Sequence, residues 1–293
     1  MVTPRGVGSV GCPSCGRYDL SLLFTKHDFP ILECRTCELQ FAPAEHTEES
    51  LRALYSEGYF VNSATGYLHY VHDEDAHRRQ ARRYLARLSR SGIRPGRLLD
   101  VGCAAGYFAD EARQAGWDVV GCDISEYATR HAERIGIRVI RGDFVNADFG
   151  GEEFDLITLF NVLEHLPSPR PVASKLYRLL KPGGLLVIET WDRNALVARV
   201  LGRWWHQYTP PYVLSYFNRV SLRRLFDREH WKVRSYRAAA KWITLRRGLS
   251  ILGGLTGTGL VAELFGWVGG TRVGGVELPY FLGDLIFSLF ERL

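Results

Sequence analysis

Residues 98–108 read LLDVGCAAGYF, and this stretch decides the fold. An apolar run that ends in Asp100 is typical of a buried parallel strand, and the glycines after it predict a tight turn into a helix. We expect Gly102 and Gly106 to bring bare backbone close to a ligand, because a side chain there would block its approach. A second apolar stretch ends in Asp123, about twenty residues further on, where an acidic residue binds ribose hydroxyls. The two stretches together predict a nucleoside-bearing ligand.

Strand and helix patterns alternate from residue 97 onward, which predicts an α/β fold with a Rossmann-like, mostly parallel sheet of seven strands and an antiparallel last strand. The expected strands are 97–101, 117–123, 137–142, 154–160, 185–190, 231–238 and 281–290. The expected helices are 106–115, one that begins at a Ser125 cap, 171–180, and one from a Ser221 cap to about residue 228. The run 181–184, KPGG, is expected to form a turn before the fifth strand.

The composition is that of a globular protein with a sizeable core: 293 residues, 46% of them hydrophobic and 24% charged. The net charge of +5 permits an anionic substrate or a membrane surface but does not demand nucleic acid. The N-terminal sequence MVTPRGVGSVGC lacks the apolar core of a signal peptide. We therefore expect the protein to be in the reducing cytoplasm, either free or bound peripherally to the inner face of the membrane.

Four of the six cysteines have the spacing of a zinc ribbon. Two C-x2-C pairs, Cys12 with Cys15 and Cys34 with Cys37, are separated by eighteen residues. Four thiolates leave no open coordination position, so we predict a structural zinc site that compensates for a small core. The alternative is four reduced cysteines in a small hairpin. Gly16 suits a knuckle turn, and Glu38 stands where glycine is common.

We divide the chain into a zinc ribbon (1–45), a helical connector or cap (46–96) and a main domain (97–293) with insertions at 191–220 and 239–279. The connector carries aromatic residues that either cover a ligand pocket or pack the ribbon onto the main domain: Tyr55, Tyr59, Phe60, Tyr67 and Tyr70. It also contains a basic helix, capped by Asp73 and running to Ser91, whose arginines form a solvated face or an RNA surface.

Five motifs in register resemble the class I S-adenosylmethionine-dependent methyltransferases of the small-molecule type. These are LLDVGCAAGYF (98–108), VVGCDIS (119–125), RGDF (141–144), FDLITLFNVLEHLPSP (154–169) and LLKPGGLLVIET (179–190). A dehydrogenase would need the G-x-G-x-x-G turn, whereas here three residues separate the two glycines.

The resemblance implies S-adenosyl-L-methionine as cofactor and a role for each matching residue. Asp100, Gly102 and Gly106 would line its methionine end, and Asp123 would bind the ribose. Asp143 would accept from the adenine amino group beside Phe144, with Phe160 and Asn161 along the cofactor. The implied binding set is completed by Cys103, Ala104, Tyr107 and Ile124. Ala104 replaces a glycine common in the family, and we expect binding to survive this change.

Methyl transfer requires orientation, and a hydroxyl acceptor also requires a base, for which histidine is suited. The two candidates are His165, just past the fourth strand, and His206 in the aromatic insertion. The alternative to a catalytic role is that each histidine only packs in its loop. The neighbouring Glu164 is expected to have a structural role. Zinc-ribbon methyltransferases that C-methylate nucleotide-linked sugars resemble this chain at residues 211–217, PYVLSYF, but they carry their base histidine where this chain has Val213.

The second insertion is apolar and rich in glycine, with Arg246 and Arg247 before it. It predicts a helical lid over an apolar acceptor, a segment that dips into a membrane surface or reaches a lipid-linked substrate, or a hairpin packed on the sheet or on a second subunit. The sequence does not fix the oligomeric state.

The favoured function is O- or C-methylation of a small-molecule acceptor such as a sugar, a glycan-lipid or another secondary metabolite. We expect no nucleic-acid partner, because EHL follows the fourth strand in place of a base-gripping motif and the charge is modest. An RNA methyltransferase with a zinc ribbon remains the alternative enzyme. A non-catalytic partner protein that binds the cofactor is the alternative outside enzymes.

Overall fold

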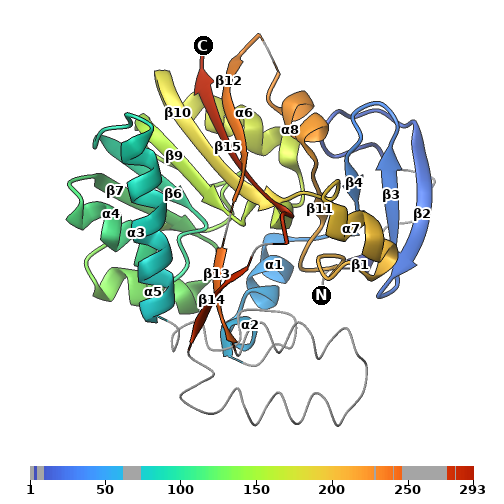
Figure 1. The fold of residues 1–293 in the computed structure, drawn as a ribbon, viewed down its shortest axis with the longest axis horizontal. Coiled ribbons are helices and arrows are strands. Elements are labelled where there is room, and N and C mark those ends of the chain that lie inside the picture. Colours follow the sequence, from blue (N-terminus) through green and yellow to red (C-terminus); the bar gives the residue numbers. More distant parts are fainter. Residues whose placement is uncertain are drawn as a thin grey trace.

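The computed structural model describes residues 3–4, 10–61, 74–227, 229–239, 241–245, 276–280 and 282–293 (Figure 1). Its main sheet has seven strands in the order β12-β15-β10-β9-β6-β7-β8. Their bounds are β6 (Arg97–Val101), β7 (Asp118–Asp123), β8 (Arg138–Arg141), β9 (Phe154–Phe160), β10 (Leu180–Trp191), β12 (Trp231–Ala238) and β15 (Leu285–Arg292). β15 runs antiparallel to both neighbours and the other pairings are parallel, which confirms the expected fold class.

The helices flank this sheet. They are α1 (Glu48–Leu54), α2 (Glu57–Val61), α3 (Glu74–Arg90), α4 (Tyr107–Gln114), α5 (Glu126–Arg134), α6 (Pro169–Leu179), α7 (Leu196–Leu201) and α8 (Arg219–Leu225). Two short 3-10 turns, η2 (Leu163–His165) and η3 (Gly202–Trp204), follow β9 and α7. Within the described residues, no helix is long and apolar enough to cross a membrane.

Successive strand residues point to opposite faces of the sheet, so two hydrophobic cores form. On one face, Leu98, Leu156 and Val187 pack with residues of α3, α4 and α5. On the other face, Leu99 and Ile157 pack with residues of α6, α8 and the N-terminal ribbon. Figure 1 shows α3, α4 and α5 together, on the opposite side of the view from the ribbon strands.

The ribbon does not form a sheet from its own strands alone. Its four strands are ordered β11-β4-β3-β2, where β2 (Leu20–Lys26), β3 (Phe29–Cys34) and β4 (Gln40–Phe41) are N-terminal and β11 (Ser215–Tyr216) comes from the first insertion. A further pair joins β1 (Thr3–Pro4) to β5 (Ala44–Glu45). Leu39 and Phe41 share a core cluster with Phe217 of the insertion. The boundary at residue 45 stays a prediction.

Three strands match their expected bounds, and three local expectations need correction. The KPGG run is an irregularity inside β10, where the pairing shifts between Leu180 and Leu185, because Gly183 with φ +74° lets the strand resume after it. The helix near Ser221 begins earlier, because Asn218 is the N-cap and accepts from Ser221 N at 2.7 Å. The last strand begins at Leu285, after a turn at Gly283 with φ +71°.

The basic helix is confirmed as α3, although its expected cap Asp73 lies outside the described residues. Arg79, Arg82 and Arg90 are exposed, as a solvated face requires. The other three arginines turn toward the protein instead: Arg78 pairs with Asp110 at 2.7 Å, and Arg83 and Arg87 are partly buried.

Most of the second insertion, residues 246–275, lies outside the described residues, so the expected lid or membrane segment is not described. Its two ends form an antiparallel pair, β13 (Lys241–Thr244) with β14 (Glu277–Tyr280).

Candidate functional site

A pocket lies at the carboxyl ends of β6, β7 and β9, the edge at which parallel α/β sheets bind ligands. It encloses about 160 Å³. Sequence-predicted residues supply much of its wall: Gly102, Ala104, Asp123, Ile124, Asp143, Phe144, Phe160, Asn161 and His165. Leu51, Tyr55, Tyr59 and Phe60 of α1, α2 and the turn between them also line it. Four of the five motifs, 98–108, 119–125, 141–144 and 154–169, therefore converge on one cavity.

The turn after β6 has three left-handed residues, Gly102, Ala104 and Gly106, with φ of +73°, +46° and +81°. The reason for glycine differs from the expected one. A Cβ at Gly102 would lie 2.3 Å from Val162 Cγ2, and a Cβ at Gly106 would lie 2.7 Å from Ala132 Cβ. These glycines therefore permit close packing of the protein on itself, as well as the turn, rather than keeping space for a ligand at both positions.

Asp123 joins the end of β7 to this turn. Its carboxylate accepts Ala104 N–H and Ser125 N–H, each at 2.8 Å. Each oxygen keeps a second lone pair for a ligand hydroxyl. Burial raises the pKa of Asp123, and the two backbone N–H groups oppose that shift. The Asp123 carboxylate therefore both fixes the loop and lines the pocket.

Asp100 does not line the pocket, although the next residue, Val101, does. It is buried, and Thr158 Oγ1 donates to Asp100 Oδ1 at 2.8 Å. Burial raises the pKa of Asp100 to about 7, and the neighbouring Asp123 adds to the shift. A positive charge nearby would favour the ionised form of Asp100, so this acid favours a cationic ligand.

The loop after β8 supplies Asp143 and Phe144. Asp143 Oδ2 accepts from Asn146 Nδ2 at 2.9 Å, which holds the loop in a tight turn. Phe144 is buried and packs edge-on against Phe149 at 5.9 Å between ring centroids. A carboxylate and an aromatic ring thus lie together at the end of the pocket formed by β8.

The end of β9 forms the opposite wall. Phe160 stacks on Tyr84 of α3 with ring centroids 4.1 Å apart. Asn161 has φ +55°, and its Nδ2 donates to Glu189 Oε1 at 3.0 Å. Tyr84 OH donates to the same oxygen at 2.6 Å. Asn161 Oδ1 is buried and has no hydrogen-bond partner among the residues described. This oxygen can therefore accept a hydrogen bond from a ligand in the pocket.

His165 lies in η2 and lines the pocket. Its Nδ1 lies 2.8 Å from the carbonyl oxygen of Tyr212, to which Tyr55 OH also donates at 3.2 Å. Because a carbonyl only accepts, Nδ1 carries a proton, and in the neutral ring the lone pair is on Nε2. Glu164 beside it is buried and accepts from Thr190 Oγ1 at 2.9 Å, which agrees with a structural role.

Tyr55, Tyr59 and Phe60 line the pocket, as one of the two expected roles requires, and they pack on the main domain; the other expected role, packing of the ribbon onto that domain, stays a prediction. Tyr55 and Tyr59 pack edge-on at 5.0 Å, and Tyr59 lies 5.4 Å from the Tyr212 ring. Phe60 lies 6.0 Å from Tyr127 of α5. Tyr67 and Tyr70 lie outside the described residues.

Five predicted site residues do not line the pocket: Asp100, Cys103, Gly106, Tyr107 and His206. Cys103 is buried against Gly121 of β7, and Tyr107 stacks on His77 of α3 at 5.8 Å. His206 Nε2 lies 3.1 Å from Tyr280 OH, which donates to the buried Asp284 at 3.3 Å. The structure therefore separates the two candidate bases.

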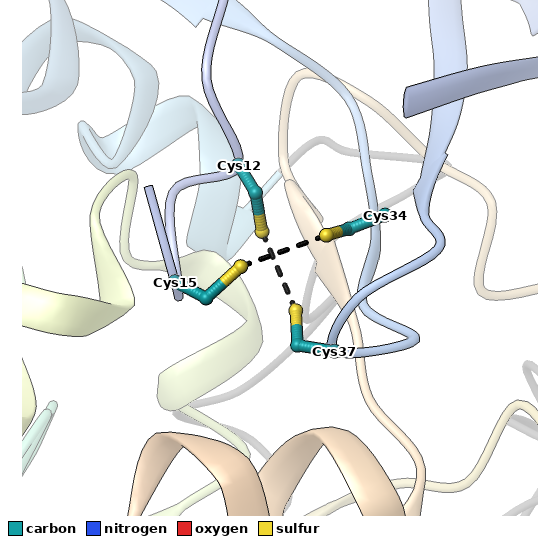
Figure 2. A group of neighbouring side chains, drawn as sticks. All are labelled: Cys12, Cys15, Cys34 and Cys37. Atoms are coloured by element: carbon teal, nitrogen blue, oxygen red, sulfur yellow. Dashed lines mark hydrogen bonds between the residues drawn. The ribbon is translucent and has the colours of Figure 1, made fainter. Parts of the chain in front are cut away.

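The four ribbon cysteines point at a common centre from two loops (Figure 2). Their sulfur atoms all lie within 4.8 Å of one another, with Cys12 to Cys37 at 3.5 Å and Cys15 to Cys34 at 3.6 Å. A tetrahedral zinc with bonds of about 2.3 Å sets sulfur atoms about 3.8 Å apart. The cluster fits a four-thiolate metal site.

Glu38, which stands where glycine is common, adopts a left-handed backbone with φ +61°. Arg193 Nη2 donates to the Glu38 carbonyl at 2.6 Å.

Sequence reasoning missed three functional contacts of the pocket. These are the Tyr212 carbonyl that orients His165, the Glu189 carboxylate that holds Asn161, and the Tyr84 ring that supports Phe160. The first is a backbone atom and carries no sequence signal. Glu189 gave a signal, because a carboxylate interrupts the apolar run of a buried strand and must have partners there.

Comparisons with known proteins agree with this geometry. The sequence model of a family described as "Methyltransferase domain" matches residues 67–236. The chain is 34% identical over 117 residues to a ubiquinone biosynthesis O-methyltransferase of Cereibacter sphaeroides, covering 37% of this chain and 47% of that protein. It is 37% identical over 118 residues to a sterol 24-C-methyltransferase of Eremothecium gossypii, covering 37% of this chain and 31% of that protein.

The chain thus spans about half or less of the length of these curated relatives. A solved structure, the magnesium protoporphyrin IX methyltransferase of Synechocystis with bound S-adenosylhomocysteine, has the same fold. Its TM-score is 0.53 at 15% identity, and the match covers 84% of this chain and 100% of that one.

Proposed function

Because the chain belongs to the methyltransferase-domain family, we propose that it transfers a methyl group from S-adenosylmethionine to a small-molecule acceptor. The observation that carries this proposal is the convergence of four sequence motifs on one pocket at the carboxyl edge of the sheet. S-adenosylmethionine supplies, when bound, a methyl carbon already activated by a cationic sulfur. The chain must then bind it, orient the acceptor and remove a proton.

The residues present fit this cofactor. The Asp123 carboxylate is suited to ribose hydroxyls, Asp143 and Phe144 to the adenine, and Asn161 Oδ1 offers a buried acceptor. The enclosed 160 Å³ is less than the roughly 300 Å³ at which ligand pockets usually begin. Tyr59 and Phe60 of α2 cover this space and pack in one hydrophobic cluster with Ala128 of α5.

We assign the base to His165. The Tyr212 carbonyl fixes its tautomer, so that Nε2 accepts a proton from an acceptor hydroxyl. Val213 is buried in a hydrophobic cluster, so no base stands where zinc-ribbon sugar C-methyltransferases carry one. His206 lies outside the pocket wall and is the second candidate.

The acceptor class we propose is a sugar, a glycan-lipid or another secondary metabolite. The names of the relatives, a ubiquinone O-methyltransferase and a sterol C-methyltransferase, support small molecules in general. The partly buried arginines of α3 reduce the surface available to RNA. Incubating cell extract with methyl-labelled cofactor tests the class: label in small molecules or lipids supports it, and label in RNA contradicts it.

The experiment that tests the cofactor site is calorimetric titration with S-adenosylhomocysteine. We expect Asp123→Ala to weaken binding about a hundredfold, because both ribose hydroxyls lose their charged acceptor. Asp148→Ala, an exposed aspartate outside the pocket, is the matched control and should bind like the wild type. Equal affinity of Asp123→Ala and Asp148→Ala would contradict the site.

We further propose that the four ribbon cysteines bind structural zinc. Their mutual distances support a closed tetrahedral site of the kind that contributes to folding and leaves no position for a substrate.

A further inference from the structure

A second cavity of about 1000 Å³ lies between α3 and the strands β12 and β15. It is a groove over the edge of the sheet, on the face that packs against α3. Its lining includes Tyr84 and Glu189, which also support Phe160 and Asn161 of the cofactor pocket. The two cavities therefore share a wall but are separate, and nothing in the methyl-transfer proposal uses the larger one.

Positive charge dominates the walls of this groove. Five arginines line it: Arg83, Arg87 and Arg90 from α3, and Arg234 and Arg237 from β12. Arg234 pairs with Glu291 at 2.5 Å. Among the residues described, no carboxylate lies within ion-pair distance of Arg87 or Arg237. Like charges on two facing walls repel each other, and an anion between them would relieve that repulsion.

Arg87 is the arginine most prepared for a ligand. Its guanidinium lies 3.8 Å above the centre of the Phe287 ring, which fixes the side chain. Burial lowers the pKa of Arg87, the facing Arg237 lowers it further, and Glu189 opposes both. Arg87 is thus held in place and half-buried, Glu189 is a carboxylate of the same groove beyond ion-pair distance, and the guanidinium is already partly desolvated before an anion binds.

The floor of the groove is apolar. Leu185, Leu289 and Ile93 line it and remain partly exposed, and Trp242 lies beneath the Arg83 guanidinium at 4.5 Å. Gln80 is buried, and its Oε1 has no partner among the described residues. The groove thus combines a cationic rim, an apolar floor and one buried acceptor.

We propose that this groove binds a small amphiphilic phosphate, with the phosphate between Arg87 and Arg237 and the apolar body over Leu185 and Leu289. Guanidinium forks match phosphate oxygens in pairs, which makes arginine on both walls the expected recognition chemistry. The volume is that of a small-molecule site, and its concave form with arginines facing each other differs from the open basic surface that RNA or a membrane requires.

Calorimetric titration of the full chain with octyl phosphate tests this proposal. We expect one molecule to bind per chain, with both inorganic phosphate and octanol at least tenfold weaker. Arg237→Gln should weaken octyl phosphate at least tenfold, and Arg87→Lys should weaken it too, because lysine keeps the charge but loses the planar fork. Arg224→Gln, an exposed arginine on α8, is the matched control.

Each other outcome overturns the proposal. Unchanged affinity in folded Arg237→Gln excludes the groove as the site. Binding of anionic vesicles or RNA that requires Arg237, without octyl phosphate binding, assigns the surface to a macromolecule. Titration with S-adenosylhomocysteine is run alongside: its failure would refute the methyltransferase proposal and leave the octyl phosphate result intact.

Discussion

Four cysteines from two ribbon loops make one site of this molecule, whereas the pocket at the sheet edge draws on α1, α2, three strands and the loops that follow them. The cysteine cluster is complete in itself, because its ligands are of one kind and face a single centre. The pocket depends on backbone geometry, such as the left-handed Ala104 held by Asp123.

This difference predicts how each site responds to change. Cys34 and Cys37 share a hydrophobic cluster with Phe41 and Phe217, so the cluster belongs to the core that folds the chain. The pocket keeps buried acids and strained turns at the edge of that core. We therefore expect substitutions in the cluster to destabilise the fold, and substitutions in the pocket to change binding and turnover with small or even favourable effects on stability.

The largest expected effect is loss of the metal site. Cys34→Ser should lower the free energy of unfolding by more than about 5 kcal/mol, because structural zinc supplies folding energy directly. Urea unfolding and metal analysis measure it, with about one zinc per wild-type chain and none in the variant. Cys103→Ser, a buried cysteine outside the cluster, should keep its zinc. If the wild-type protein folds equally well without metal, the cysteine cluster does not contribute to folding, and the contrast with the pocket is wrong.

The next effect has the opposite sign and concerns Asp100. Its pKa in the folded chain is about 7, above the roughly 3.9 of an unfolded aspartate, so the folded state binds the extra proton. The stability of the wild type should therefore fall as pH rises from about 4 to 7. Asp100→Asn removes that cost and keeps the acceptor for Thr158, so it should stabilise the cofactor-free chain at pH 8 by up to about 4 kcal/mol.

Urea unfolding of both proteins at pH 5 and pH 8 measures this prediction. The variant should gain up to about 4 kcal/mol at pH 8 and only about 1.5 kcal/mol at pH 5. If the stability of the wild type is the same at both pH values, the pKa of Asp100 is not raised in the folded chain.

A smaller expected effect is confined to chemistry. His165→Ala should lower turnover about a hundredfold and leave S-adenosylhomocysteine affinity unchanged, because the base acts on the acceptor. His230→Ala, an exposed histidine paired with Asp227, is the control. Loss of the limb of the pH–rate profile that reports the base would separate proton transfer from mere packing. Near-normal turnover of His165→Ala would show that His165 has a structural role and is not the base.

The smallest expected effect is at Ala104, whose left-handed φ of +46° strains an L-residue. Ala104→Gly should relieve this strain and stabilise the chain by about 0.5–1 kcal/mol, which is roughly 2 °C in Tm. Thermal unfolding measures it. A lower Tm would mean that the flexibility of glycine in the unfolded chain outweighs the relief.

Most of the fold could be predicted from the sequence, because the periodicity of apolar residues and the spacing of turn residues indicate the strands and helices directly. The strands 97–101, 154–160 and 231–238 match to the residue, since each is a run of strand-forming residues with a clear stop. The Ser221 cap failed because Asn218, three residues earlier, offers a better-placed acceptor, a choice that only the backbone path settles.

The site was predicted where a side chain carries the signal and missed where a contact joins distant segments. Asp123 follows directly from its position after a strand. The hydrogen bond from His165 to the Tyr212 carbonyl spans 47 residues and ends on a backbone atom, so no residue type encodes it. The same holds for the placing of His206 beside Tyr280 and away from the pocket.

The pairing of β11 with β4 has a consequence for engineering. The ribbon and the methyltransferase domain are not interchangeable modules, because a strand from residues 215–216 completes the ribbon sheet and Phe217 fills its core. A truncated chain that starts after the ribbon would present an unpaired strand edge and bare aromatic surface, and we expect it to aggregate. Chimeras that exchange ribbons between such chains must carry residues 212–218 along with the cysteines.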